Sequence, residues 1–539
     1  MALDMTPEEQ AIGEGNFKRV VGQLALDDAA ARQKGLSRRD FMKGMLAAGG
    51  VALPLSAAAY FGYDSERGFG KPVKAGLIGA GDEGGVLVGE HNPAYLEFVA
   101  YSDIRPSNQK RIFQGELHRN PNSPRKGFYH MYGSDAKNKI KQYDDYHQLL
   151  DDPDIEAVVI ALPLHLHAPV AIEAMQKGKH VLCEKLMAWN IDQCKQMIQA
   201  AREHDKVLSI GHQRHYSMLY AHANEVIQAG VLGDVKHIRA LWHRNNTPPR
   251  GDSWSKAVPE EDRKALESTI QRHGYKSMEE LVRWRLYNRT GGGLMAELGS
   301  HQLDACSIFL GKVHPLAVSG VGGKFFYKDD REVEDHVFVT FEFPGKNYYV
   351  DPSTRKEIKD PNDIVIVTYS SISTNAFEPY GECVMGRDGT MVVETEAKVM
   401  LWKERGSKPD DGGRRVDISV TSGGGSSPAL DASASTGPAA AQAAVTGGAA
   451  LGAGPVSKGY REEMEHFAYC IRMWQQGASK EDRPKPHCDG VAAMADAIMA
   501  LTANQAMRKR ERIVFQDAWF DPDAKEVPDA DMKPEEITV

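Results

Sequence analysis

A glycine-rich turn between two apolar runs constrains the fold of this chain more than any other feature. Residues 73–78 form the first apolar run, and Gly79, Gly81 and Gly84 follow before a helical pattern begins. The second apolar run ends at Asp103. This order is the fingerprint of a dinucleotide-binding strand–helix–strand unit, whose helix N-terminus attracts a pyrophosphate.

Each residue of the motif has an expected role in binding the cofactor. Gly79 makes the tight turn, Gly81 lets the backbone approach the pyrophosphate, and Gly84 lets the helix pack closely on the strand. The Asp103 carboxylate is expected to accept hydrogen bonds from the adenosine ribose and to repel a 2′-phosphate, which favours NAD over NADP. Arg105 weakens that preference, so NADP stays possible.

The chain then alternates between strand-type and helix-type segments. Strand-type segments end near Pro163, at Glu184-Lys185 and at 212–213. Repeated strand–helix units predict a parallel sheet with helices on both faces, and ligands bind beyond the carboxyl ends of its strands. We therefore expect Pro163, Glu184 and Lys185 to lie at the cofactor. Asp82 and Glu83, inside the glycine turn, are expected to point to solvent because carboxylates repel a pyrophosphate.

These segments resemble the Gfo/Idh/MocA family, which includes glucose–fructose oxidoreductase and inositol dehydrogenase. The similar stretches are "GLIGAGDEGG", "ALPLHLHAPVAIEAMQKGKHVLCEKLMAWN", "GHQRHY" and "GGGLMAELGSHQLD". The predicted fold is α/β: a Rossmann NAD(P)-binding domain over 71–213, then an α+β domain over 214–515 that contains a large, open, mostly antiparallel sheet.

The resemblance also implies the reacting residues. The Glu-Lys-Pro signature of the family occurs here as Glu184-Lys185-Leu186, which implies that Lys185 contacts both the nicotinamide ribose and the reacting hydroxyl. The Asp-x-x-x-His signature occurs with Glu297 in place of Asp, followed by His301 as the implied general base.

Other positions are assigned by the same resemblance and by residue type. His167 is implied at the cofactor-side rim, and Asp304 in the substrate site. Arg214, in "GHQRHY", and the pair Trp284 and Arg285 are further substrate candidates, because aromatic and guanidinium groups commonly bind sugar rings.

The residue types suit the oxidation of an alcohol. A histidine with a pKa near neutrality accepts the hydroxyl proton, a lysine ammonium stabilises the alkoxide, and NAD accepts the hydride. We predict an NAD(P)-dependent oxidoreductase that acts on the CH–OH group of a carbohydrate, with a tightly held cofactor. Two alternatives stay open: an NAD-dependent glycosidase that works by transient oxidation and elimination, and a non-catalytic sugar-binding protein.

Alternating apolar segments after residue 214 predict the strands of the second domain. The outer face of that sheet is an expected surface for a homodimer or tetramer. A polar insertion spans about 246–280. Residues 406–458, rich in Gly, Ser, Ala and Pro, predict a disordered loop within the domain, and 516–539 a C-terminal tail.

An export signal precedes the nucleotide domain. The stretch "SRRDFMK" at 37–43 matches the twin-arginine pattern, and an uncharged, mainly apolar stretch follows over 44–63. The triple alanine at 57–59 offers a cleavage site; without cleavage the stretch would be an anchor. Residues 1–36 form a leader, and 37–70 the signal and linker. We expect export to the periplasm through the twin-arginine machinery, which carries folded, cofactor-loaded proteins.

Charge and cysteine content exclude several classes of protein. The net charge is −9 and the pI about 6.1, so nothing suggests a nucleic-acid partner. Six cysteines occur without C-x-x-C spacing, which argues against a disulfide scaffold and a structural zinc site. No metal is expected from spacing alone.

Overall fold

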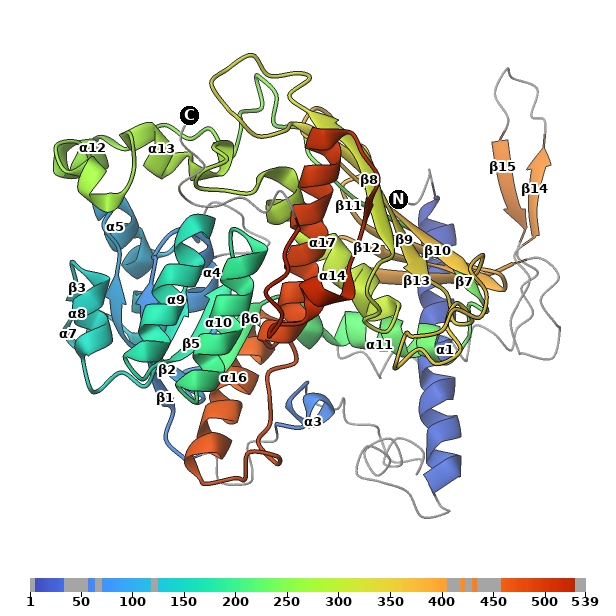
Figure 1. Ribbon diagram of the computed structural model, residues 1–539, viewed down its shortest axis with the longest axis horizontal. Coiled ribbons are helices and arrows are strands. Elements are labelled where there is room, and N and C mark those ends of the chain that lie inside the picture. Colours follow the sequence, from blue (N-terminus) through green and yellow to red (C-terminus); the bar gives the residue numbers. More distant parts are fainter. Residues whose placement is uncertain are drawn as a thin grey trace.

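The computed structural model describes residues 5–32, 57–63, 70–117, 125–404, 417–421, 429–433 and 457–528. The twin-arginine motif at 37–43 lies outside these residues. Two sheets dominate the described chain, and the helix α17 (Gly490–Lys509) runs between them (Figure 1).

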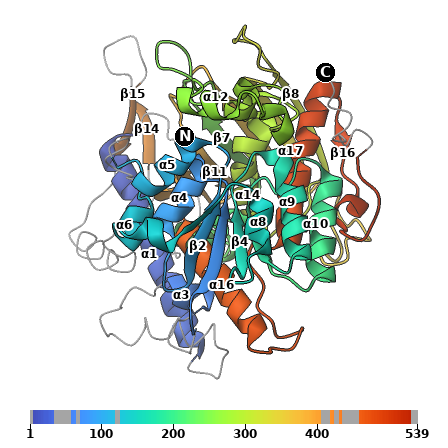
Figure 2. The same cartoon turned by 90° about the vertical axis from the view of Figure 1, so that its left-hand side faces the viewer.

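The first sheet is parallel throughout, with strand order β3-β2-β1-β4-β5-β6. Its strands are β1 (Val73–Ile78), β2 (Leu96–Ser102), β3 (Lys141–Tyr143), β4 (Ala157–Ile160), β5 (His180–Glu184) and β6 (Leu208–Gly211). One face is covered by α8 (Tyr146–Asp151), α9 (His167–Gln176) and α10 (Ile191–Glu203). The opposite face is covered by α4 (Asp82–Glu90), α5 (Pro106–Gln114) and α6 (Phe128–Tyr132) (Figure 2). The predicted Rossmann-type layering is confirmed.

A helix from far along the chain completes the second of these faces. In α16 (Tyr460–Gln475), Met464, Phe467 and Ile471 are fully buried in the same core as Leu77 of β1. The apolar stripe of α16 needs a partner surface, and the nucleotide sheet provides it. The first sheet therefore packs against a helix that lies outside the predicted Rossmann segment 71–213.

The second sheet is mixed and mostly antiparallel, as predicted. Its order is β13-β12-β11-β7-β10-β9-β8-β16, and only β7 and β10 run parallel. The strands are β7 (Val235–His243), β8 (Ala317–Gly323), β9 (His336–Pro344), β10 (Ile364–Ile372), β11 (Tyr380–Gly386), β12 (Gly389–Glu394), β13 (Lys398–Lys403) and β16 (Ile513–Val514). Helices α14 (Ser300–Phe309) and α17 pack on it.

The glycine-rich insertion contains more structure than we predicted. Residues 417–421 form β14 (Asp417–Thr421), which pairs antiparallel with β15 (Ala429–Ser433). The prediction of a disordered loop over 406–458 was therefore wrong for these two segments. The β-branched Ile418, Val420 and Thr421 favour a strand at β14, a signal that the surrounding Gly and Ser had obscured.

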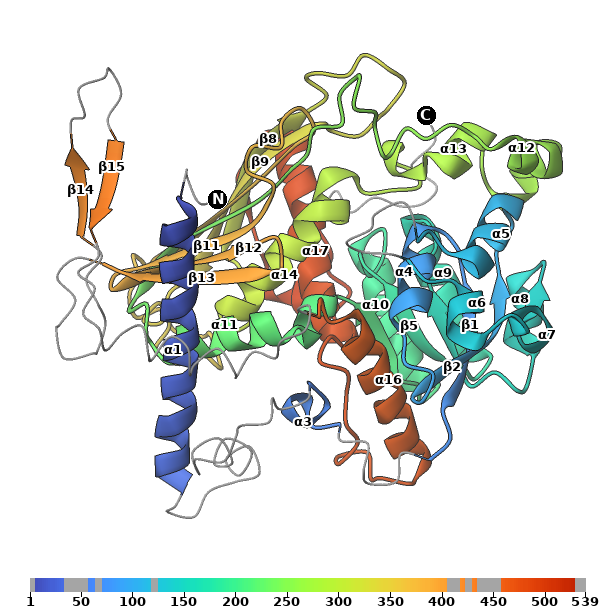
Figure 3. The same ribbon diagram turned by 180° about the vertical axis from the view of Figure 1, so that it is seen from behind.

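The N-terminal leader forms a helix that packs on the second domain. Helix α1 (Pro7–Arg32) lies against β13, as Figure 3 shows from behind. Phe17 is 3% exposed, and the Asn16 amide donates to the Leu401 carbonyl at 3.0 Å. Helix α3 (Ala57–Phe61), at the end of the apolar stretch, packs against α16.

Two chemical features of the described residues bear on the predictions. No helix among them has both the length and the apolarity needed to cross a bilayer. All six cysteines lie among the described residues, where they are buried and form no disulfide, in agreement with the exclusion of a disulfide scaffold.

Candidate active site

The glycine turn after β1 has the geometry that a dinucleotide requires. Gly79 adopts φ +96°, and a Cβ there would overlap the Ala161 carbonyl oxygen. A Cβ on Gly84 would overlap the Gly79 carbonyl oxygen, so both positions exclude a side chain. Gly81 lines an open cavity with nothing within 4 Å of its Cβ position, which leaves room for the phosphates beside the α4 N-terminus.

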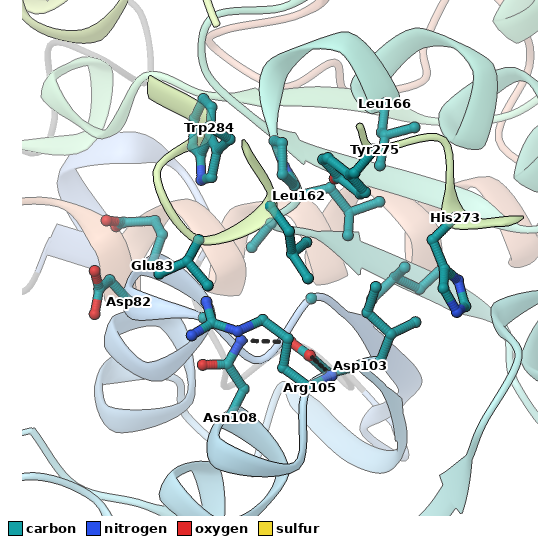
Figure 4. Close-up of a pocket in the computed structure, with 18 of the residues that line it drawn as sticks. Asp82, Glu83, Asp103, Arg105, Asn108, Leu162, Leu166, His273, Tyr275 and Trp284 are labelled. Atoms are coloured by element: carbon teal, nitrogen blue, oxygen red, sulfur yellow. Dashed lines mark hydrogen bonds between the residues drawn. The ribbon is translucent and has the colours of Figure 1, made fainter. Parts of the chain in front are cut away.

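Asp103, directly after β2, closes this turn from the other side. Its carboxylate accepts from the main-chain N–H of Ala80 at 2.8 Å and of Arg105 at 2.7 Å, and from the Asn108 amide at 3.0 Å (Figure 4). Burial raises the pKa of Asp103, although these donors oppose the effect. The side chain lines the cavity where an adenosine ribose would lie.

The Arg105 side chain binds a carboxylate of the insertion. Its Nε donates to the buried Asp262 carboxylate at 2.9 Å, and Ser107 donates to the same carboxylate through its N–H and its hydroxyl. Asp262 lies in α12 (Glu260–Leu266) of the insertion. The guanidinium that could have favoured a 2′-phosphate therefore anchors the insertion instead.

The cavity measures about 730 Å³, which is within the range of cofactor and ligand sites. The nucleotide domain forms one wall, and the insertion forms the other. In Figure 4, Tyr275 and Trp284 lie across the cavity from Asp103 and Arg105. The insertion is thus part of the cavity wall that faces Asp103, a position that its sequence did not reveal.

The expectation that Asp82 and Glu83 point to solvent was wrong, since both line the cavity. Asp82 pairs with Arg111 at 2.8 Å and with Lys256 of the insertion. Burial raises the pKa of Asp82, but these cations outweigh it and hold the pKa well below its usual range. Burial raises the pKa of Glu83, whose Oε1 has no hydrogen-bond partner among the described residues. Cations offset the charge of Asp82, and burial disfavours the charged form of Glu83, so neither carboxyl group need repel a pyrophosphate.

The predicted rim residues lie together along the cavity. Pro163, His167, Glu184 and Lys185 all line it. The His167 ring bridges the carbonyls of Leu162 and Leu186, each at 2.8 Å, and so joins the loops after β4 and β5. The peptide bond between Lys185 and Leu186 is cis.

Lys185 meets the second domain at a π-helical turn, η7 (Met295–Gly299). Its ammonium donates to the Glu297 carbonyl oxygen at 2.8 Å, and the Glu297 carboxylate accepts from Arg285 Nε at 2.7 Å. Burial raises the pKa of Glu297, but Arg285 and Lys185 outweigh it and hold the pKa below its ordinary value. Such π-helical turns are frequent at functional sites.

His301, in the first turn of α14, lies behind this pair and does not line the cavity. It is 9% exposed, and Trp242 packs on the ring with centroids 5.5 Å apart. Its Nδ1 has no hydrogen-bond partner in the ranges of the chain that the structure describes. Burial, followed by the positive charges of Lys185 and Arg214, lowers the pKa of His301 well below its usual value. The imidazole is therefore neutral at pH 7 and able to accept a proton.

Arg214 was expected at the substrate but lies outside the cavity. It is 1% exposed and ion-paired to Glu382 at 2.9 Å and to Glu396 at 2.8 Å. Its Nη1 also donates to the His301 carbonyl at 2.6 Å. This buried network holds the helix that carries His301, and it leaves the guanidinium facing protein groups rather than a ligand.

Asp304 also lies outside the cavity. It is fully buried, and its Oδ1 is 2.6 Å from His215 Nε2. Trp284 and Arg285 do line the cavity, and the Arg285 guanidinium lies over the Trp284 ring at 4.2 Å. Of the four proposed substrate residues, the structure therefore brings two to the cavity beside Lys185.

Two models of one family match the chain. The "Oxidoreductase family, NAD-binding Rossmann fold" matches residues 73–212, and the "GFO/IDH/MocA C-terminal domain" matches residues 220–368.

Curated relatives match over shorter stretches. Inositol 2-dehydrogenase of Salmonella typhimurium is 33% identical over 112 residues, which cover 21% of this chain and 33% of that protein. The 2,7-anhydro-N-acetylneuraminate hydratase of Mediterraneibacter gnavus is 24% identical over 209 residues, which cover 38% and 47%. The chain spans about half or less of the length of such relatives.

Solved structures share the fold. An inositol dehydrogenase homologue from Azotobacter vinelandii, complexed with NADH and myo-inositol, superposes with a TM-score of 0.54. The identity is 16%, and the match covers 83% of this chain and 98% of that one. With both domains matched and the glycine turn and Asp103 in place, the chain belongs to the Gfo/Idh/MocA oxidoreductase family and carries its NAD-binding Rossmann domain.

Proposed function

We propose that this protein is an exported, NAD-dependent oxidoreductase that acts on a CH–OH group of a sugar or polyol. The observation that carries the proposal is the contact of Lys185 with the main chain of Glu297, four residues before His301. This contact places an ammonium, a carboxylate and a neutral imidazole near one end of the cavity, away from Asp103.

The residues of the chain have separate tasks in this proposal. The glycine turn and Asp103 hold the dinucleotide, and bound NAD accepts the hydride. Lys185 stabilises the negative charge that develops on the substrate oxygen. His301 takes the hydroxyl proton, which its lowered pKa permits at pH 7.

The substrate class follows from the wall opposite the nucleotide domain. Trp284 offers an aromatic face, and Arg285 and Lys185 offer donors to hydroxyl oxygens. Sugars present both an apolar face and several hydroxyls, so this combination suits them. Inositol 2-dehydrogenase and the inositol-bound homologue support the same class.

A redox-neutral reaction is the second candidate. The relative named as 2,7-anhydro-N-acetylneuraminate hydratase favours it. Transient oxidation, elimination, addition of water and re-reduction would use the same lysine, histidine and NAD, and would leave NAD unchanged after each turnover. A non-catalytic sugar-binding protein is the remaining alternative.

Export and assembly are further parts of the proposal. The motif at 37–43 supports twin-arginine delivery to the periplasm. Exposed Val321 and Phe338 pair across β8 and β9 on one face of the second sheet, which supports a homodimer or tetramer through that face. Replacing Arg38 and Arg39 by lysine should retain the protein in the cytoplasm, as fractionation would show.

The deciding experiment begins with natively exported protein. Denaturation of one sample should release NAD(H), which chromatography identifies. In a second, native sample, members of a panel of sugars and polyols should reduce the bound cofactor. Product lacking two hydrogens supports the dehydrogenase, whereas product changed only by elimination or hydration supports the redox-neutral reaction. Protein that binds sugars but never changes the absorbance of its nicotinamide, and gives no product, would be a binding protein.

A further inference from the structure

Three buried side chains from three separate elements converge between the two sheets. His212 follows β6, Asp304 lies in α14, and Asp496 lies in α17. Their exposures are 1%, 0% and 1%. Each side chain offers one nitrogen or oxygen atom, and these three atoms all lie within 4.8 Å of one another.

Most polar atoms of this cluster have no partner outside it. Both His212 nitrogens make no hydrogen bond with the residues that the structure describes. Within those residues, the Asp496 oxygens and Asp304 Oδ2 have no partner except one another, because the two carboxyl groups lie close enough to share a hydrogen bond. Native proteins satisfy nearly all buried polar atoms, so several orphans in one place indicate a missing ligand. His212 is evidence for a ligand that does not depend on the two carboxyl groups, because a buried imidazole with two unpartnered nitrogens is unusual.

The distance between His212 and Asp304 suits coordination better than a hydrogen bond. His212 Nδ1 and Asp304 Oδ2 are 3.9 Å apart, which is too far for a hydrogen bond. Two ligands of one ion, each at roughly 2.0–2.2 Å from it, can be separated by this distance. The other Asp304 oxygen is held by His215 at 2.6 Å, which orients the carboxylate as outer-shell partners of metal ligands do.

The charges around the cluster call for a cation. Asp304 and Asp496 contribute two carboxyl groups, and Glu463 of α16 adds a third whose oxygens have no hydrogen-bond partner in the part of the chain that the structure describes. The ammonium of Lys312, 3.1 Å from His215 Nε2, belongs to an exposed side chain. One peripheral ammonium does not balance this many buried carboxyl groups.

We propose that His212, Asp304 and Asp496 bind one divalent transition-metal ion. One imidazole and two carboxylates match the donors that Zn²⁺ and Mn²⁺ accept, and they neutralise a 2+ charge. The ion would join β6 to α14 and α17, and so fix the helix that carries His301. None of the three residues lines the cavity, so metal content can be measured separately from the proposed reaction.

The test uses the full chain purified without chelators or metal-affinity resin. Elemental analysis should find about one equivalent of a divalent metal per chain. After chelation and desalting, Mn²⁺ or Zn²⁺ should restore that stoichiometry and raise Tm, since an ion that binds only the folded state stabilises it. Bound Mn²⁺ should also lose its aqueous electron paramagnetic resonance signal.

Two variants and a matched control locate the site. Asp496→Asn keeps the shape of the side chain and should lower the bound metal at least about tenfold. His212→Gln should do the same, and circular dichroism checks that each variant folds. Glu463→Gln removes another buried, unpartnered carboxyl group outside the cluster and should leave the stoichiometry unchanged.

Two results would overturn the proposal. One is wild-type protein that holds no metal as purified and takes up neither Mn²⁺ nor Zn²⁺. The other is a folded Asp496→Asn protein that binds as much metal as the wild type. In either case, a proton shared between Asp304 and Asp496 would account for the two carboxyl groups.

Discussion

Lys185 is linked to Glu297 by a hydrogen bond of 2.8 Å from its ammonium to the main-chain carbonyl oxygen. The bond joins the end of β5 in one domain to the π-helical turn of the other. The bond therefore fixes the ammonium at the wall of the cavity. Its remaining donors can bind a substrate oxygen.

Removing this ammonium should slow hydride transfer. Lys185→Ala is expected to lower kcat on the best sugar by more than about a hundredfold, because charge stabilisation in the transition state is lost. Lys185→Arg should not restore the rate, since a planar guanidinium cannot replace a compact ammonium. Cofactor content, measured after denaturation, should match that of the wild type; rates within about threefold of wild type would remove Lys185 from the mechanism.

The pH dependence should report His301. Burial and the Lys185 charge hold the pKa of this imidazole well below its usual value, so the acidic limb of the rate profile should lie below neutrality. In Lys185→Ala the limb should move to higher pH, because a neighbouring positive charge is gone. His301→Ala should abolish it, and the double variant should be little slower than either single one. A limb that persists in His301→Ala would identify another base.

Cofactor choice should depend on three residues. Asp103→Ser alone should weaken NAD binding without creating strong NADP binding, because Arg105 stays paired with Asp262. Adding Asp262→Asn should release the guanidinium for a 2′-phosphate and shift the ratio of Kd values towards NADP. Asp262→Asn alone should speed cofactor release. Glu260→Gln, which changes an exposed carboxylate of the same helix, is the control and should change neither quantity.

The junction of α16 with the nucleotide sheet should be sensitive to acid. Glu156 pairs with Arg472 at 2.6 Å. Burial raises its pKa, but hydrogen bonds from Arg472 and Lys74 outweigh that effect and lower the pKa to about 2. A lowered carboxyl pKa stabilises the fold above about pH 4.5 and ceases to do so as the pH falls towards 2.

Glu156→Gln should therefore lower the unfolding free energy at pH 7 by about 1 kcal/mol or less, as is usual for a partly exposed ion pair. The difference from wild type should shrink as the pH falls from 5 to about 3. Urea unfolding at several pH values measures it. A difference that is constant over this range would mean that packing, rather than the ionised pair, is lost.

Two glycines of α1 allow a matched test of its docking. A Cβ on Gly13 would lie 2.6 Å from Trp402 Cζ2, whereas Gly15 has nothing within 4 Å. Gly13→Ala should destabilise the packing of α1 by about 1–3 kcal/mol. Gly15→Ala should be neutral or stabilising by up to about 1 kcal/mol, because alanine favours a helix. Limited proteolysis of the leader compares them, and equal cleavage would contradict the docking.

The cofactor half of the site could be predicted because its determinants are local in sequence. Gly79, Gly81, Gly84 and Asp103 lie within one strand–helix–strand unit, and the parallel order of the strands brings Pro163, Glu184 and Lys185 to the same edge. The mixed sheet of the second domain followed from the alternation of its strands.

What could not be predicted depends on pairing across long sequence distances. Arg105 gives no sign in the sequence of its partner Asp262, and Arg214 gives none of Glu382 and Glu396. The cluster of His212, Asp304 and Asp496 is formed by residues whose spacing matches no motif. Only the packing of α14 and α17 between the sheets brings these three together.

The docking of α1 and α3 changes what signal processing would mean for this protein. Both helices pack on the folded body, with Phe17 buried on one and the Tyr60 hydroxyl of the other bonded to Glu225 at 2.7 Å. A peptidase cut after Ala59 would sever α1 from the rest of the chain while its contacts with β13 remained. The product would contain two polypeptides held together by those contacts, and one of them would be a helix that lies ahead of the predicted export motif.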